Sequence, residues 1–140
     1  MKNEFRNKVI ILGPDHHNTL GLIRSLGEIQ VCVCAVILDA ASSFVSKSKY
    51  LKEVLYCRSN AQEILSLLQN KYGNEDEKPV LIPSSDTAAL LIDELKDELK
   101  EHFYLSGVSG SLGLAHYMNK MNLGCLAKSL DVTEIGRAHV

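Results

Sequence analysis

The chain has 140 residues, enough for one domain with a sizeable buried core. Apolar residues make up 46% and charged residues 23%, as in an ordinary soluble protein, and the formal net charge of -2 gives no electrostatic reason to expect nucleic acid or an anionic membrane as a partner. The longest apolar stretches fall well short of the roughly 20 residues of a membrane helix, and the N-terminus has no apolar core of signal-peptide length, so we expect a cytoplasmic protein.

The first predicted unit is a strand, a turn and a helix. Val9 to Gly13 is an apolar run ending in Gly-Pro, which predicts a strand buried on both faces of a parallel sheet. An amphipathic segment, Leu20 to Gly27, predicts the helix. Ligands of such sheets bind at the carboxyl ends of the strands, so the intervening loop, Gly13 to Asn18, is the first candidate site.

Two more strands are predicted next. Gln30 to Leu38 is rich in β-branched residues and predicts a second buried strand, followed by a small polar loop from Asp39 to Ser43. Phe44 to Leu51 carries lysines between serines and aromatic residues, and we interpret it as a solvated connection with one helical turn. Glu53 to Cys57 predicts a short third strand.

A capped helix is predicted after the third strand. Asn60 with Glu63 three residues later approximates a capping box, and apolar residues follow at helical spacing as far as Tyr72. Gly73 is expected to end this helix. The charged stretch from Asn74 to Lys78 is interpreted as an exposed turn.

The second half repeats the alternation. Val80 to Pro83 predicts a fourth strand, and the polar residues Ser84 to Asp86 suit the N-terminus of a helix expected over Thr87 to His102. A short fifth strand, Phe103 to Leu105, is followed by a glycine-rich loop that lacks the GxxxxGK[ST] pattern. Leu114 to Leu130 predicts a last amphipathic helix.

The order of elements predicts the fold class. Strands and helices alternate without an internal repeat, which indicates an α/β fold with an open, mostly parallel sheet of about four or five strands and helices on both faces. The cysteines form no CxxC pair, so we expect them to be reduced and structural, with neither a metal site nor disulfides. They are Cys32, Cys34, Cys57 and Cys125.

Two stretches resemble the N-terminal domain of ATP-grasp enzymes, the carboxylate-amine or carboxylate-thiol ligases. They are the opening, Val9 to Glu28, and the final helix, His116 to Val132. In the final helix, Lys120, Ala127 and Val132 fall on the family pattern. The chain departs from that pattern at two positions, where Asn119 replaces the usual Asp and Asp131 replaces a common Gly.

The resemblance implies a Rossmann-like pre-ATP-grasp domain over residues 1–133. Parent enzymes of this family activate a carboxylate with ATP to an acyl phosphate, which an amine then attacks, with Mg²⁺ held by acidic residues of a C-terminal domain. The chain stops where that domain would begin, so we expect an N-terminal fragment that is inactive alone and binds no cofactor alone. By the resemblance, Lys120 reaches the nucleotide phosphates, although a solvated helix lysine is the equal alternative.

By the same analogy, the loops after the first and fourth strands face the acceptor substrate. The candidate residues are Asp15, His16, His17, Asn18, Ser84, Ser85 and Asp86. The two histidines could hydrogen-bond a carboxylate, or they could cap the following helix, and Asp15 could simply close an Asx turn. The expected partners are a small-molecule carboxylate and an amine, together with a homodimer as an open option, and no catalytic residue or metal ligand is assigned.

The last seven residues, Glu134 to Val140, read EIGRAHV. This stretch resembles the in-frame translation of a common short-read sequencing adaptor and bears no relation to the family pattern. We therefore expect a non-native tail and a native reading frame that was cut near Thr133, the alternative being an ordinary short tail.

Two other functions are compatible with an α/β chain. A dinucleotide-binding Rossmann domain needs G-x-G-x-x-G after the first strand; the turn here is G-P-D-H-H-N, although Asp39 stands where a ribose-binding acid would. A receiver-type signalling module needs an aspartate at the end of the third strand, where this chain has Tyr56, Cys57 and Arg58.

Overall fold

The computed structural model describes residues 5–105, 125 and 127–131. The chain divides into two compact units, Met1–Ser106 and Gly107–Val140. In the second unit Cys125 and residues 127–129 are helical, within the range of the last predicted helix. Lys120, the glycine-rich loop and the tail over residues 134–140 lie outside the described residues.

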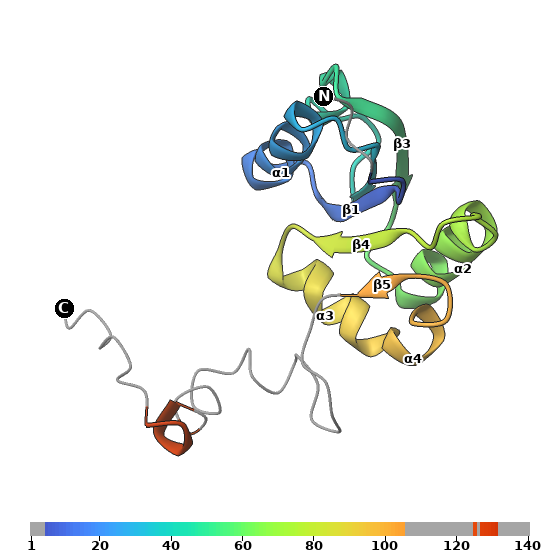
Figure 1. Ribbon diagram of the computed structural model, residues 1–140. Helices are drawn as coiled ribbons and strands as arrows, with labels where there is room; N and C mark the ends of the chain where they lie inside the picture. Colours follow the sequence, from blue (N-terminus) through green and yellow to red (C-terminus); the bar gives the residue numbers. More distant parts are fainter. Residues whose placement is uncertain (1–4, 106–124, 126, 132–140) are drawn as a thin grey trace. The chain divides into compact units, whose positions relative to one another are not determined.

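The first unit is built on a five-stranded sheet in which every strand pair is parallel (Figure 1). The strand order is β3-β2-β1-β4-β5. The strands are β1 (Val9–Pro14), β2 (Val33–Leu38), β3 (Leu51–Cys57), β4 (Val80–Pro83) and β5 (Tyr104–Leu105). The predicted α/β class and the five strands are therefore confirmed, and the sheet is wholly parallel.

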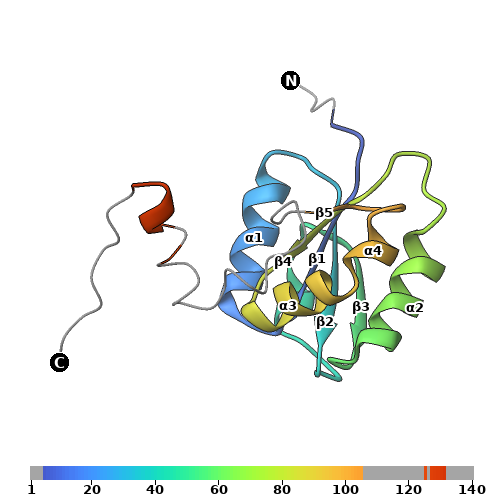
Figure 2. The same cartoon turned by 90° about the horizontal axis from the view of Figure 1, so that it is seen from below.

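Helices cover both faces of this sheet (Figure 2). One face is covered by α1 (His17–Glu28) and by the single turn of 3-10 helix η1 (Val45–Lys47). The opposite face is covered by α2 (Ala61–Tyr72), α3 (Asp86–Glu94) and α4 (Lys96–Leu99). None of the helices in the described part of the chain is both long enough and apolar enough to cross a membrane.

Alternate residues of each central strand feed two separate cores. In β1, Ile10 and Leu12 belong to the core under α2, α3 and α4, whereas Val9 and Ile11 belong to the core under α1. All six residues of β2 are buried as well. This double burial explains why both strands read as continuous apolar runs, since neither has a face that water reaches. Cys34 is one of these buried residues of β2. Its burial raises the pKa of the thiol to about 11.

Two predicted elements differ in their bounds from the structure. The helix expected over Thr87 to His102 is broken at Leu95, whose N–H bonds the carbonyls of both Leu91 and Ile92. Leu95, Leu99 and Phe103, which are spaced four residues apart, are all buried. In addition, β2 begins at Val33 and not at Gln30, because Gln30 has a φ of 64° in the turn that follows α1.

The connection between β2 and β3 also differs from the expectation. Its one helical turn, η1, is confirmed, but the segment is not simply solvated, because Ser43 and Val45 are buried. Asn60 caps α2 as predicted, since its side chain accepts from the N–H of Glu63. The second half of a capping box is missing, because the Glu63 carboxylate pairs with Arg58.

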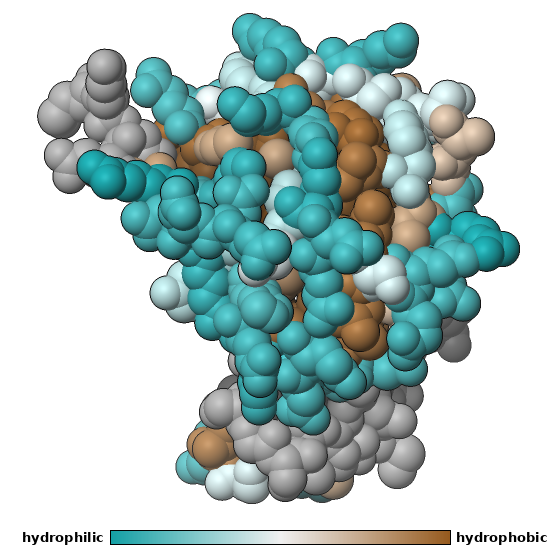
Figure 3. All heavy atoms as spheres, turned by 90° about the vertical axis from the view of Figure 1, so that its right-hand side faces the viewer, coloured by the Kyte–Doolittle hydropathy of each residue, from teal (hydrophilic) through white to brown (hydrophobic). Residues whose placement is uncertain are grey.

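A polar cluster fastens the edge strand β3 to α2. The Tyr72 hydroxyl donates to the Glu53 carboxylate over 2.6 Å, and Lys71 pairs with the same carboxylate at 2.9 Å. The hydrogen bond from Tyr72, reinforced by Lys71, holds the pKa of Glu53 below its ordinary value. Figure 3 views this side of the molecule and shows hydrophilic residues over most of the face, with a hydrophobic strip between them.

Two glycines of α1 provide a matched test of helix packing. A Cβ on Gly27 would overlap the Cβ and ring atoms of Tyr50, whereas a Cβ on Gly21 would meet nothing within 4 Å. We expect Gly27→Ala to lower the free energy of unfolding by about 1–3 kcal/mol through overpacking. We expect Gly21→Ala to raise it by roughly 0.5–1 kcal/mol through helix propensity. Urea denaturation measures both, and equal shifts would contradict this packing of α1.

Candidate functional site

The carboxyl ends of β1 and β4 mark the point where the strand order of the sheet reverses. The two strands pair in parallel, with Leu12 opposite Pro83. The chain leaves β1 for α1 on one face and leaves β4 for α3 on the opposite face. Open α/β sheets bind ligands in the crevice at such a switch point. The structure thus brings together the two loops that the sequence singled out, Gly13 to Asn18 and Ser84 to Asp86.

Two partly buried contacts join these loops, and a third holds the first loop onto α1. The backbone N–H of Ser84 donates to the Leu12 carbonyl over 2.9 Å, and the hydroxyls of Ser84 and Thr19 lie 2.7 Å apart. Thr19, fully buried, donates in turn to the Pro14 carbonyl over 2.7 Å. A Cβ on Gly13 would overlap the Ser84 hydroxyl, so glycine is required for this close approach. Ser84 therefore serves the scaffold of the site.

Asp15 connects the first loop to the distant β2–β3 connection. One of its carboxylate oxygens accepts from the Ser43 hydroxyl and from the backbone N–H of Val45, the latter over 3.2 Å. The hydrogen bond from Ser43, supported by backbone N–H groups, holds the pKa of Asp15 below its ordinary value of 3.8. Asp15 is thus a bracing residue between two loops, and the Asx turn considered from the sequence is not what its carboxylate makes.

The two histidines and Asn18 form the exposed part of the first loop. His16 is the N-cap of α1, and its Nδ1 accepts from the backbone N–H of Asn18 over 3.2 Å. This hydrogen bond places the proton of the neutral ring on Nε2, which can donate to a ligand. The His17 ring lies 5.7 Å from the His16 ring and 5.5 Å from the Phe44 ring, between centroids. Phe44 was not identified as a site residue from the sequence.

The second loop begins α3. Ser85 is the N-cap, as predicted, because its hydroxyl accepts from the backbone N–H of Ala88 over 3.1 Å. Asp86 lies exposed in the first turn, where its negative charge complements the helix dipole. The first turn of α1 carries no acidic residue. Of the two helix N-termini at the switch point, that of α1 is therefore the more favourable for an anionic group.

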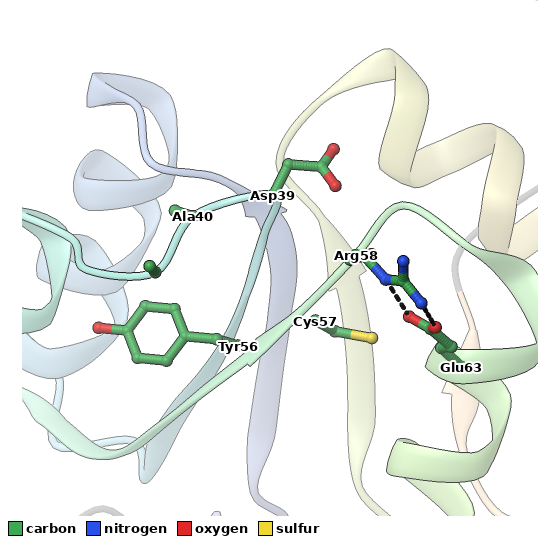
Figure 4. A pocket seen from close by; sticks show the side chains of 7 residues that line it. Asp39, Ala40, Tyr56, Cys57, Arg58 and Glu63 are labelled. Atoms are coloured by element: carbon green, nitrogen blue, oxygen red, sulfur yellow. Dashed lines mark hydrogen bonds and ion pairs between the residues drawn. The ribbon is translucent and has the colours of Figure 1, made fainter.

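Apart from the switch point, a hollow of about 560 Å³ lies at the carboxyl ends of β2 and β3 (Figure 4). It is lined by Asp39, Ala40, Ala41, Tyr56, Cys57, Arg58 and Glu63. The Arg58 guanidinium makes a two-pronged ion pair with Glu63. In Figure 4 the Asp39 carboxylate points away from the Tyr56 ring, so the polar and aromatic parts of the lining do not face each other.

Two observations bear on the alternative functions, a dinucleotide-binding domain and a receiver-type module. Both carboxylate oxygens of Asp39 accept from Ser59, one from its N–H over 2.9 Å and one from its hydroxyl over 2.5 Å. Asp39 therefore braces the turn before α2, which weighs against a ribose-binding role. The strand order 3-2-1-4-5 differs from the 2-1-3-4-5 order of receiver-type folds, which weighs against a receiver module.

The described residues contain no group of three or more His, Cys, Asp or Glu side chains that could hold a metal ion. The predicted phosphate contact, Lys120, lies outside them. All seven candidate residues of the acceptor site lie within them, in the two loops at the switch point. Of these, Asp15, His16, Ser84 and Ser85 make structural hydrogen bonds, and His17, Asn18 and Asp86 are exposed.

Comparison with known proteins supports the fold. No family model and no curated protein matches the sequence. Among solved structures, the chain is similar to glycinamide-RNase-transformylase T from Mycobacterium tuberculosis, with a TM-score of 0.57 and 14% sequence identity. The match covers 87% of this chain and 35% of that one, so the chain spans about a third of the transformylase's length. The likeness defines the class of fold, an α/β domain with a parallel sheet.

The contacts of Asp15 predict a pH dependence that the variant Asp15→Asn removes. A carboxylate whose pKa is lowered on folding stabilises the fold above the ordinary pKa of 3.8, and this contribution is lost as the pH falls through the lower folded-state value. The unfolding free energy of Asp15→Asn should therefore lie below that of the parent at pH 6. The difference should close as the pH falls through the lowered folded-state pKa of Asp15.

Chemical denaturation across this pH range measures the effect. Asp76→Asn, in the exposed turn between α2 and β4, is the matched control and should follow the parent at every pH. The decisive quantity is the difference in unfolding free energy between Asp15→Asn and the parent. If this difference is the same at pH 6 and pH 3, the carboxylate charge does not brace the loops.

Proposed function

We propose that this chain is the amino-terminal, substrate-binding domain of an ATP-grasp ligase, which joins a small-molecule carboxylate to an amine. The observation that carries the proposal is the convergence of the β1 and β4 loops at the switch point of the sheet. Two further points support it. The opening stretch resembles the family, and the similar transformylase is an ATP-grasp enzyme with a pre-ATP-grasp domain.

In this proposal the acceptor is the carboxylate substrate that receives the phosphoryl group. Its carboxylate lies over the N-terminus of α1. The Nε2 of His16, the His17 ring and the Asn18 amide supply hydrogen-bond donors there, and no acidic residue of the first turn opposes the negative charge. Asp15, Thr19 and Ser84 keep the two loops in place. In this proposal these residues bind and orient the acceptor carboxylate, and none of them is assigned a step of the reaction.

ATP and Mg²⁺ belong, in this proposal, to the parent enzyme. The parent would transfer a phosphoryl group from ATP to the carboxylate, and the amine would displace the phosphate from the acyl phosphate. Lys120 would contact the nucleotide phosphates, and acidic residues beyond this domain would hold Mg²⁺. We propose that the 140-residue chain alone turns over no ATP, acts in the cytoplasm, and binds neither nucleic acid nor membrane; a homodimer is compatible with this role.

Binding of a simple carboxylate tests the proposal directly. Acetate titrated into the 140-residue chain should shift backbone amide NMR signals of residues 13–19 and 84–88 at millimolar concentrations. His17→Ala and Asn18→Ala should each weaken this binding about tenfold, as expected for lost hydrogen bonds to a charged group. Both side chains are exposed, so the midpoint of thermal unfolding should not change.

The controls separate this function from its alternatives. Asn70→Ala, on the exposed face of α2, should bind acetate as the parent does. NAD should produce no heat in calorimetry, because the turn after β1 lacks the glycines of a dinucleotide site. Tight NAD binding, or acetate shifts located elsewhere on the sheet, would refute the proposal. Recovery of the uninterrupted gene, without an acidic metal-binding cluster after residue 133, would refute it as well.

A further inference from the structure

Phe44 stands out among the residues around the switch point because its large apolar side chain is 46% exposed. Its two neighbours along the chain are buried, Ser43 at 7% and Val45 at 0%. The side chains on either side of Phe44 thus point into the protein, and its own ring is directed outward. An exposed aromatic ring on a segment whose backbone is fixed by hydrogen bonds offers an apolar surface that a ligand can cover.

The segment around Phe44 is held by several hydrogen bonds. The Asp15 carboxylate accepts from Ser43 and Val45. The Ser46 N–H donates to the Ser43 hydroxyl over 3.3 Å, and the Ser46 hydroxyl donates to the Ser43 carbonyl over 2.5 Å. Val45 is packed in the core under α1. The position of the Phe44 ring is therefore set by a residue of the β1–α1 loop, the loop that carries His16 and His17.

As a result, three aromatic rings form a row of neighbours at the carboxyl end of β1, in which the His17 ring is next to both the His16 ring and the Phe44 ring. The centroids of His16 and His17 are 5.7 Å apart with their planes at 67°, and those of His17 and Phe44 are 5.5 Å apart with their planes at 52°. All three residues are exposed. The row begins at the N-cap of α1, where the proposed carboxylate lies, and ends on the β2–β3 connection.

We propose that Phe44 and His17 form an aromatic wall of the acceptor site, and that the acceptor is a carboxylate attached to a planar aromatic ring. This inference rests on the proposed function. The carboxylate lies at the N-terminus of α1, and the ring of the acceptor packs against the Phe44 and His17 rings in an offset or edge-to-face arrangement. Asp15 is a positioning residue, because it holds Phe44 beside His17.

The experiment compares three probes on the 140-residue chain by amide NMR titration: acetate, benzoate and cyclohexanecarboxylate. Benzoate adds a planar aromatic ring to the carboxylate, and cyclohexanecarboxylate adds a ring of similar size that is neither flat nor aromatic. Benzoate should bind about five- to tenfold more tightly than acetate, with added shifts at residues 43–46. Cyclohexanecarboxylate should bind more weakly than benzoate.

Variants locate the effect. Phe44→Ala should abolish the advantage of benzoate, measured as the ratio of benzoate to acetate affinity in the same variant. Phe44→Leu, which keeps an apolar side chain and protects against loss of folding, should abolish that advantage as well. Phe5→Ala is the matched control, because Phe5 is also 46% exposed but lies beside Val9 at the start of β1. It should leave both affinities unchanged.

The outcomes separate the two proposals. Acetate binding at residues 13–19 with no advantage for benzoate would overturn the aromatic wall and leave the proposed function intact. Equal affinities for benzoate and cyclohexanecarboxylate would overturn it in the same way, as would a benzoate advantage that survives Phe44→Ala. Absence of binding by all three carboxylates would overturn both.

Discussion

The burial of β1 on both faces is the constraint from which the rest of this domain follows. β1 lies between β2 and β4, and its side chains alternate between two cores. A strand in this position cannot expose its backbone or side chains to water, so only the loops at its ends can offer polar groups, and α/β sheets bind ligands at the carboxyl end. Because the chain continues from β1 and from β4 on opposite faces, the two following loops meet there.

The polar residues at that meeting point divide into two groups. One group has its hydrogen bonds satisfied within the protein and fixes the loops: Asp15 with Ser43, and Thr19 with Ser84. The other group, His17, Asn18 and the ring of Phe44, is exposed on the fixed frame. In the proposed site the backbone that carries these exposed groups is thus fixed by contacts made without a ligand, which lowers the cost of ordering on binding.

Local patterns predicted most of the elements because their causes are local. The apolar runs of β1 and β2 reflect burial on both faces, and Asn60 and Ser85 cap α2 and α3 through N–H groups only three residues away. The break at Leu95 could not be read from periodicity. It is visible only in the backbone, where the Leu95 N–H bonds the carbonyls of both Leu91 and Ile92.

The sequence by itself determined the α/β class, the strands and the two loops that border the candidate site, because these depend on neighbouring residues and on the periodicity of burial. Only the tertiary structure decided which polar groups of those loops are engaged. Asp15 reaches Ser43 across 28 positions, and Thr19 reaches Ser84 across 65. Such pairings depend on the strand order, which local spacing does not encode, and the same order places Phe44 beside His17.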